Sequence, residues 1–319
     1  MKILITGCCG FIGSNLTERL LSLDHQIIGI DNFDKYYSKD LKLRNIEYAS
    51  NHKNFQFLEA DVFNISELKF DKESIDLVIH LAASPGVINS FKDTSFCIHN
   101  NINVTHKLLE FTLDNNVKKF IFASSSSVYG VNENLPWNED ENLIPISPYA
   151  FTKLSCESLG KMYSQISDIK FLALRFFTVY GPRQRPDLAI FKFFDKIVSS
   201  KKVDIYGEGQ TFRDYTYIDD IVDGINYRFS SLSSKKFERK IWNINFYESI
   251  VVFEINQECS DITSVPTENN GIDLDTADLR YKDSQSVKTF IGLATKFKFL
   301  NKFVFFRVIK NYLLKYFIV

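Results

Sequence analysis

The chain has 319 residues, of which 45% are hydrophobic and 24% are charged, a composition typical of a globular protein with a sizeable core. Its formal net charge of -1 gives no bulk attraction to nucleic acid or anionic membranes, and the absence of a long apolar run predicts no spanning membrane segment. The five cysteines lack metal-ligand spacing, so we expect no metal site. Their odd number argues against a disulfide framework, and we expect a reducing cytoplasmic compartment.

Short apolar runs alternate with helical patterns along the first half of the chain. The apolar runs predict strands at 3–6, 26–31, 55–61, 77–83 and 119–124. The helical patterns predict helices at 11–23 and 96–115, and a further helix–strand pair at 149–164 and 170–177. This alternation predicts βαβ units and an α/β fold with a Rossmann-like, doubly wound parallel sheet.

A glycine-rich turn, Gly7 to Gly13, joins the first predicted strand to the first predicted helix. Gly7 permits a tight turn, Gly10 lets the backbone approach a pyrophosphate at the helix N-terminus, and Gly13 allows close helix–strand packing. Asp31 ends the second strand, 18 residues after Gly13, where a carboxylate can accept both hydroxyls of an adenosine ribose and repel a 2′-phosphate. Together these features predict a site for NAD rather than NADP.

A run of serines, Ser124–Ser127, ends the predicted strand at 119–124, where a parallel sheet binds its ligands. Farther along, Tyr149 and Lys153 are at i and i+4 and share one face of the predicted helix. The ammonium group stabilises a phenolate and lowers the tyrosine pKa from about 10 toward the working pH. A tyrosine tuned in this way can take a proton from a substrate hydroxyl and later return it.

The pattern changes after about residue 181, where loops lengthen and proline and glycine become frequent. We therefore expect residues 1–180 to form an NAD-binding Rossmann domain. Residues 181–319 are expected to form mainly a smaller substrate-binding domain, with some segments returning to the Rossmann sheet.

Several motifs share the order in which one known family carries them: the glycine turn, Asp31, Leu81–Ala83, Ser124–Gly130, the Tyr149/Lys153 pair, Arg175–Gly181 and Arg213–Asp220. On these motifs the chain resembles the extended short-chain dehydrogenase/reductase family over about residues 1–228. Within the family it is most similar to NAD-dependent UDP-sugar 4-epimerases, and among them to the UDP-glucuronate 4-epimerases.

The resemblance implies roles for individual residues. Ser125 would orient the sugar 4-hydroxyl, Tyr149 would be the acid/base, and Lys153 would hold the nicotinamide ribose and tune Tyr149. The residues that it places along NAD are Gly7, Gly10, Phe11, Ile12, Gly13, Asp31, Asn32, Asp61, Val62, Leu81, Ala82, Ala83, Asn100, Tyr149 and Lys153.

The resemblance also implies a site for the UDP-sugar substrate. Arg213 would clamp the UDP phosphates, and Ile205 and Tyr206 would flank the uracil. The residues that it places toward this substrate are Gly86, Val87, Ser126, Ser127, Thr178, Arg185, Ile205, Tyr206 and Arg213.

A uronate substrate is favoured by Thr178, which stands where galactose epimerases of this family usually carry Asn, and by the basic loop at 181–187. A C6 carboxylate needs charge-assisted donors, which Arg185 could supply with hydroxyls from Ser126, Ser127 and Thr178. Alternatively, Arg183 and Arg185 contact phosphate or solvent. The expected reaction converts UDP-glucuronate to UDP-galacturonate through a 4-keto intermediate.

Other functions fit part of the same pattern. A UDP-glucose or UDP-N-acetylglucosamine 4-epimerase would use the same core, as would a UDP-glucuronate decarboxylase, although its relatives usually carry Asn at the position of Thr178. A catalytically idle NAD-binding regulator is a different class. Such proteins commonly lose the tyrosine or the lysine, and both Tyr149 and Lys153 are present.

The resemblance further implies a homodimer formed by two helices of each subunit, with the helices near 96–115 and 149–164 as candidates, and a role in polysaccharide biosynthesis. It weakens over residues 230–283, where Asp278 and Arg280 are candidates to complete the UDP site. The last residues, 303–319, are apolar with interspersed basic residues. They predict a helix packed on the body or on a partner, or an amphipathic helix on a membrane surface.

Overall fold

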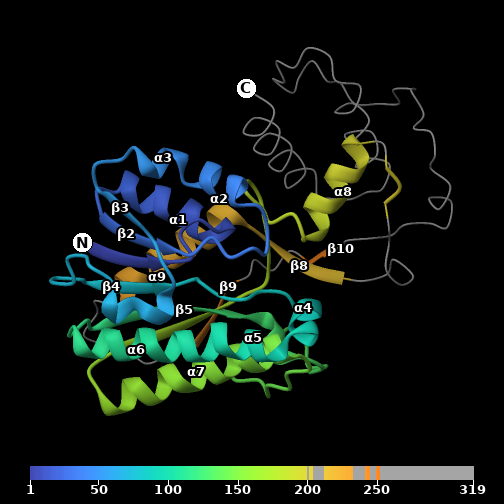
Figure 1. Ribbon diagram of the computed structural model, residues 1–319. Coiled ribbons are helices and arrows are strands. Elements are labelled where there is room, and N and C mark those ends of the chain that lie inside the picture. Colours follow the sequence, from blue (N-terminus) through green and yellow to red (C-terminus); the bar gives the residue numbers. More distant parts are fainter. Residues whose placement is uncertain (200, 204–211, 233–240, 245–248, 252–319) are drawn as a thin grey trace. The chain divides into compact units, whose positions relative to one another are not determined.

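The computed structural model describes residues 1–199, 201–203, 212–232, 241–244 and 249–251 (Figure 1). Its centre is a 7-stranded sheet of order β3-β2-β1-β4-β5-β6-β9, in which every neighbouring pair is parallel. The strands are β1 (Lys2–Thr6), β2 (Gln26–Asp31), β3 (Phe55–Glu59), β4 (Leu77–His80), β5 (Lys119–Ser125), β6 (Lys170–Phe176) and β9 (Ile241–Ile244). This order confirms the predicted Rossmann-like, doubly wound sheet.

Helices cover both faces of the sheet. On one face α1 (Phe11–Ser22) packs against α9 (Ile218–Ser231), and on the other α6 (Val104–Asp114) packs against α7 (Pro148–Ile166); Figure 1 shows α1 above the sheet and α6 and α7 below it. Shorter helical elements join the layers: α2 (Lys39–Asn45), α3 (Glu47–Ser50), η1 (Val62–Glu67), α4 (Val87–Lys92), α5 (Thr94–Ile98), η2 (His99–Asn103) and η3 (Ser126–Tyr129).

The start and the close packing of α7 follow from its sequence. Ser147 is the N-cap, and its hydroxyl accepts a hydrogen bond of 3.1 Å from the amide of Ala150. Pro148 occupies the first turn, where its missing N–H costs nothing. Gly160 faces β6 so closely that a Cβ there would stand 2.0 Å from the ring of Phe171. Glycine at this position therefore sets the distance between the helix and the sheet.

Most predicted elements agree with the observed bounds to within about two residues, and three differ more clearly. The strands predicted at 55–61 and 77–83 are shorter, because Asp61 caps η1 and because the chain leaves the sheet after His80. The helix predicted at 96–115 is divided into α5, a π-helical turn at His99–Asn103, and α6. Such a turn inside a helix frequently marks a functional site.

The chain separates into two compact units, one of residues 1–179 with 216–245 and one of residues 180–215 with 246–319. Besides the large sheet and the helices that cover it, the described residues form α8 (Ala189–Val198) and a 3-stranded sheet of order β10-β8-β7. Its strands are β7 (Thr178–Tyr180), β8 (Phe212–Tyr217) and β10 (Ser249–Val251). The division at residue 180 into cofactor and substrate domains stays a prediction.

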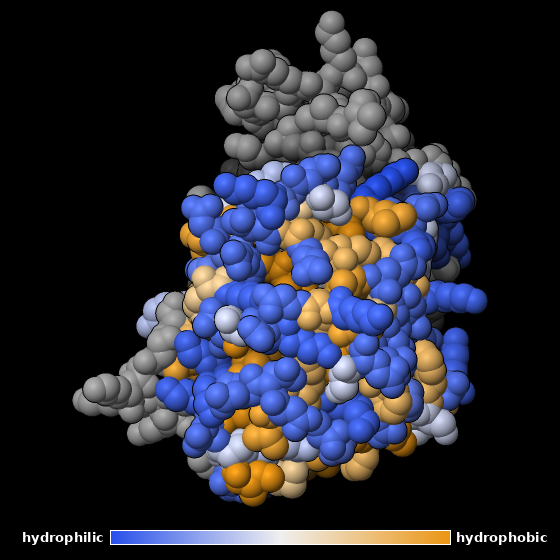
Figure 2. Space-filling view, turned by 60° about the vertical axis from the view of Figure 1, so that its left-hand side comes forward, coloured by the Kyte–Doolittle hydropathy of each residue, from blue (hydrophilic) through white to orange (hydrophobic). Residues whose placement is uncertain are grey.

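Several residues considered from the sequence lie outside the described residues: Ile205, Tyr206, Asp278, Arg280 and 303–319. Along the described part of the chain, each helix is too short or too polar to cross a bilayer. Figure 2 shows one face of the molecule, where hydrophobic side chains lie in small groups between hydrophilic ones. Such mixing is ordinary for a protein surface.

Candidate active site

The turn between β1 and α1 has the geometry of a phosphate cradle. Gly7 has φ +71°, and its amide donates to the carbonyl of Ile30 at 2.8 Å. A Cβ on Gly13 would stand 2.1 Å from the carbonyl oxygen of Gly7, so a side chain there would force the helix off the turn. Gly10 is the N-cap of α1 and has no side chain to occupy the first amides of the helix. The turn therefore fits the pyrophosphate of a dinucleotide.

The same turn touches the segment that follows β4. The amide of Ala82 donates to the hydroxyl of Thr6 at 3.2 Å, and a Cβ on Gly7 would stand 2.8 Å from the amide nitrogen of Ala82. From β1 the chain adds β2 and β3 on one side of the sheet and β4, β5 and β6 on the other. Open parallel sheets bind their ligands at the carboxyl ends of the strands where the order reverses in this way. The structure thus brings Leu81–Ala83 beside the glycine turn, as the cofactor prediction requires.

Asp31 lies at the far side of the turn and is 7% exposed. Its carboxylate accepts from the amides of Cys9 and Phe33 at 3.2 and 2.9 Å. The sequence prediction did not include Lys42, whose Nζ lies 3.6 Å from Oδ1 of Asp31. Lys42 is buried and lies in α2. No sequence spacing connects this helix with the end of β2.

Two more residues of the cofactor prediction contact each other. The side-chain amide of Asn32 donates to Oδ2 of Asp61 at 3.2 Å, and Oδ1 of Asp61 accepts from the amide of Phe63. Val62 follows Asp61 and is buried. These contacts place the ends of β2 and β3 together at the same edge of the sheet as the glycine turn.

Lys153 is buried in the face of α7 that lies against β5. Its Nζ donates to the carbonyl of Ala123 at 2.7 Å and lies 5.8 Å from the centroid of the Tyr149 ring. Burial lowers the pKa of Lys153 from 10.5 to about 8, while the nearby Glu157 carboxylate raises it. Tyr149 is partly exposed and Lys153 is not. The ammonium group therefore reaches the tyrosine from the protein interior.

Ser125 ends β5 and begins the η3 turn. Its hydroxyl accepts from the amide of Ser127 at 3.2 Å and from the hydroxyl of Ser127 at 2.9 Å. Since Lys153 holds Ala123 in the same strand, the predicted triad of Ser125, Tyr149 and Lys153 comes from two adjoining elements. Ser126 and Ser127 are partly exposed beside it, as is Thr178 at the start of β7.

His80 is the one histidine at the carboxyl end of the described sheet strands, and it is fully enclosed. Its ring nitrogens lie 2.7 Å from the hydroxyl of Thr6 and 3.0 Å from that of Thr105. Burial lowers the pKa of His80 to about 3, so the ring is neutral at working pH. His80 therefore ties β1, β4 and α6 together.

Asn101, in the π-helical turn, is a buried residue that the sequence prediction did not name, and the cofactor role of its neighbour Asn100 stays a prediction. Its side chain accepts from the amide of Ser84 at 2.7 Å and donates to the carbonyl of Ser84 at 3.2 Å. It also donates to the hydroxyl of Thr152 on α7 at 2.9 Å. Asn101 therefore fixes the segment between Ala82 and Gly86 against α7. Two adjacent asparagines give no sequence signal for which one does so.

The residues predicted to bind the UDP-sugar are only partly described. Gly86 has φ +98°, and a Cβ there would stand 2.8 Å from the hydroxyl of Tyr36, while Val87 is exposed at the start of α4. In the second unit, Arg185 donates through Nε and Nη2 to both carboxylate oxygens of Asp187, at 3.0 and 3.2 Å. Arg213 lies in β8 opposite Ile250 of β10, and its side chain is outside the description.

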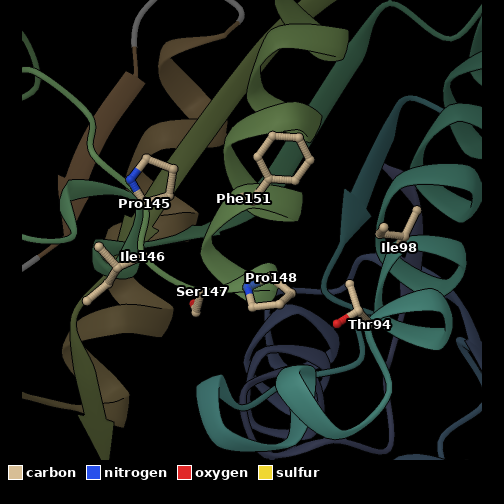
Figure 3. Close-up of a pocket in the computed structure, with 7 residues that line it drawn as sticks. All are labelled: Thr94, Ile98, Pro145, Ile146, Ser147, Pro148 and Phe151. Atoms are coloured by element: carbon tan, nitrogen blue, oxygen red, sulfur yellow. The ribbon is translucent and has the colours of Figure 1, made fainter.

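A cavity of about 370 Å³ opens beside the start of α7 (Figure 3). It is lined mostly by apolar side chains: Thr94, Ile98, Pro145, Ile146, Ser147, Pro148 and Phe151. Phe151 follows Tyr149 by two residues, which turns it by roughly 200° around the helix axis. The cavity therefore lies at the N-terminal end of α7, on the side of that helix that carries Phe151.

Comparison with known proteins gives consistent matches. Residues 3–244 match the NAD dependent epimerase/dehydratase family. Protein CapI of Staphylococcus aureus is 42% identical over 229 residues, covering 71% of this chain and 68% of CapI. The UDP-glucuronate 4-epimerase of Thermodesulfobacterium geofontis is 40% identical over 224 residues, covering 69% of each.

Among solved structures, the UDP-glucuronic acid 4-epimerase of Bacillus cereus in complex with UDP-glucuronic acid and NAD is similar, with a TM-score of 0.71 and 41% identity. The match covers 78% of this chain and 79% of the Bacillus chain.

Proposed function

The chain belongs to the NAD dependent epimerase/dehydratase family, and from this premise we propose that it inverts C4 of UDP-glucuronate to form UDP-galacturonate, with NAD as its cofactor. The observation that carries the proposal is the buried ammonium group of Lys153 beside Tyr149, next to the strand end that bears Ser125. This arrangement supports proton transfer at a hydroxyl without a metal ion or a histidine.

The chain's own residues would hold the cofactor along the sheet edge described above. The glycine turn receives the pyrophosphate, Asp31 the adenosine ribose, and Leu81–Ala83 the middle of the dinucleotide. Bound there, NAD would supply the hydride chemistry at C4, and the reaction would have no net oxidation. Everything else in the reaction is a matter of orienting the sugar and moving one proton.

Tyr149 is proposed to take the proton of the 4-hydroxyl and to return it after the sugar has turned. Lys153 supplies the positive charge that stabilises the phenolate, and its interior position keeps that charge from solvent. Ser125 is proposed to hydrogen-bond the 4-oxygen, since its hydroxyl lies at the strand end beside α7. A positioned acid/base of this kind contributes on the order of 10²- to 10⁴-fold to a rate.

The carboxylate of the sugar needs separate control. A 4-keto uronate is a β-keto acid and loses CO₂ unless the C5–C6 bond is held near the plane of the ketone. We propose that the hydroxyls of Ser126, Ser127 and Thr178 hold this carboxylate, together with Arg185. Hydroxyl donors and a guanidinium group provide charge-assisted hydrogen bonds for this purpose.

The test is to incubate the purified protein and NAD with UDP-glucuronate, UDP-glucose or UDP-N-acetylglucosamine and to separate the products by chromatography. The proposal predicts UDP-galacturonate from the first substrate and little turnover of the neutral sugars. A UDP-pentose product would instead indicate a decarboxylase. Turnover of a neutral sugar alone would indicate a different 4-epimerase.

We also propose that two copies associate through α5, α6 and α7. Large apolar side chains project from these helices into solvent: Phe96, Ile98, Leu113, Phe151, Met162 and Ile166. Exposed apolar groups of this kind are found at association surfaces, and two of these side chains, Ile98 and Phe151, line the cavity of Figure 3. Light scattering on the purified protein tests this, with a mass of twice 37.0 kDa expected. Cytoplasmic location and a role in polysaccharide biosynthesis stay predictions.

A further inference from the structure

A buried ion pair lies behind the proposed active site and has no part in the chemistry described so far. Arg175 of β6 donates to Glu157 of α7 through Nε at 3.0 Å and through Nη2 at 2.8 Å. Their side chains are 1% and 3% exposed. Removing two such charges from water costs several kcal/mol per ion, so a pair of this kind is poor evidence of stabilisation. The contacts that the two side chains make with other residues indicate its role.

Each partner of the pair holds one end of the serine turn. The hydroxyl of Ser124, the residue before Ser125, donates to Oε1 of Glu157. Nη1 of Arg175 donates to the hydroxyl of Tyr129 at 2.9 Å, and its guanidinium group lies 4.9 Å from the centroid of that ring. Ser124 and Tyr129 are the first and last residues of the segment 124–129, the serine turn, so this segment with the hydroxyls of Ser125, Ser126 and Ser127 is fixed at both ends.

The pair also connects this turn to the catalytic helix. Tyr149, Lys153 and Glu157 follow one another at i, i+4 and i+8, which places them along one stripe of α7. Lys153 holds the carbonyl of Ala123 and Glu157 holds the hydroxyl of Ser124, so successive turns of α7 hold successive residues of β5. The ion pair therefore sets the spacing between the tyrosine stripe and the serine turn.

We propose that Glu157 and Arg175 are positioning residues of the 4-epimerase, which fix the serine turn at the distance from Tyr149 that proton transfer at the sugar 4-hydroxyl requires. This inference rests on the proposed function. It follows from the general sensitivity of catalysis to geometry, because a displacement of about 1 Å can cost about 100-fold in rate. Neither residue touches the substrate in this account.

The direct variant, Glu157→Gln, leaves Arg175 as an uncompensated buried charge and can unfold the protein. Two milder variants, Ser124→Ala and Tyr129→Phe, each remove one hydroxyl and leave the ion pair intact. Matched controls are Ser164→Ala and Tyr163→Phe, which make the same changes at buried positions of α7 away from the turn. For each protein we would measure kcat, KM, the Kd for NAD by calorimetry and the melting temperature.

We expect Ser124→Ala and Tyr129→Phe each to lower kcat by about tenfold, and the double variant by about 100-fold, because the turn loses its fixed place. KM, NAD affinity and melting temperature should match those of the two controls. If kcat stays within about twofold of wild type, or falls only in step with the melting temperature, the contacts are merely structural and the inference is overturned.

The assays use whichever UDP-sugar the wild-type protein epimerises. Turnover of a neutral sugar in place of UDP-glucuronate would therefore overturn the substrate proposal while still testing the positioning pair. Absence of turnover with every UDP-sugar would overturn both.

Discussion

The two sides of α7 differ in a way that the folding of one chain does not require. The side that faces β5 and β6 buries Lys153 and Glu157, and each has a polar partner. The opposite side exposes Phe151 to 54% and Ile166 to 70%. An amphipathic helix normally buries its apolar stripe and exposes its charges. We propose that the inward side of α7 serves the chemistry and that the outward side associates with a second copy.

Removal of the charge on the inward side should have the largest effect. Lys153→Met keeps the length of the side chain but loses the ammonium group that approaches Tyr149 and Ala123. We expect kcat to fall by about 10²- to 10⁴-fold, the range of an acid/base contribution, with the oligomeric state unchanged. Steady-state kinetics and light scattering check this. Ser155→Ala, at a partly exposed position of the same helix, should keep full activity, and a Lys153→Met enzyme within tenfold of wild type would contradict the account.

A charge introduced on the outward side of α7 should weaken association and leave kcat nearly unchanged. Phe151→Glu is expected to weaken association of two copies by about 30-fold or more, as loss of a central interface aromatic does. Because Tyr149 points to the other side of the helix, kcat per site should stay within about threefold. Analytical ultracentrifugation and kinetics measure the two quantities. Phe151→Leu should associate normally, and a Phe151→Glu protein that still dimerises would remove this side of α7 from the interface.

A rise in pH should have a smaller effect that again distinguishes the two sides of α7, because it should change kcat and leave association unchanged. Burial lowers the pKa of Lys153 to about 8, so the ammonium group is lost, and kcat should fall, as pH rises through about 8. Association should not change over this range, because Phe151 and Ile166 carry no titratable group.

Stability should move in the other direction over the same window. The unfolded chain holds the Lys153 proton up to its ordinary pKa of 10.5, so between about pH 8 and 10.5 the unfolded state binds more protons and the free energy of unfolding rises with pH. Urea unfolding of wild type and Lys153→Met gives this difference. An equal pH dependence for both proteins would show that Lys153 does not titrate early.

Much of the candidate cofactor site can be read from the sequence because its constraints are local. A glycine is needed at position 13 since a Cβ would meet the turn at 2.1 Å, and that need is visible in the sequence as a spacing. The i, i+4 relation of Tyr149 and Lys153 is likewise a property of one helix. The sheet order followed from the alternation of strands and helices, which leaves few topologies for a parallel sheet.

The supporting contacts could not be predicted because they join distant parts of the chain. Asn101 reaches Ser84, and Glu157 reaches Arg175, only after the strand register has been set. Arg185 presents a related case, since its bidentate contact with Asp187 is local but has no distinguishing spacing. Residue type and spacing indicate which groups do the chemistry, whereas the groups that hold them in place require the folded structure.

The most direct test of the central claim is the turnover of UDP-glucuronate by Tyr149→Phe, measured beside its affinity for NAD. The phenyl ring keeps the shape of the site and removes the hydroxyl that is proposed to carry the proton. We predict that UDP-galacturonate formation falls by about 10³-fold while the Kd for NAD stays within about threefold of wild type. A Tyr149→Phe protein that still forms UDP-galacturonate at the wild-type rate would contradict the account.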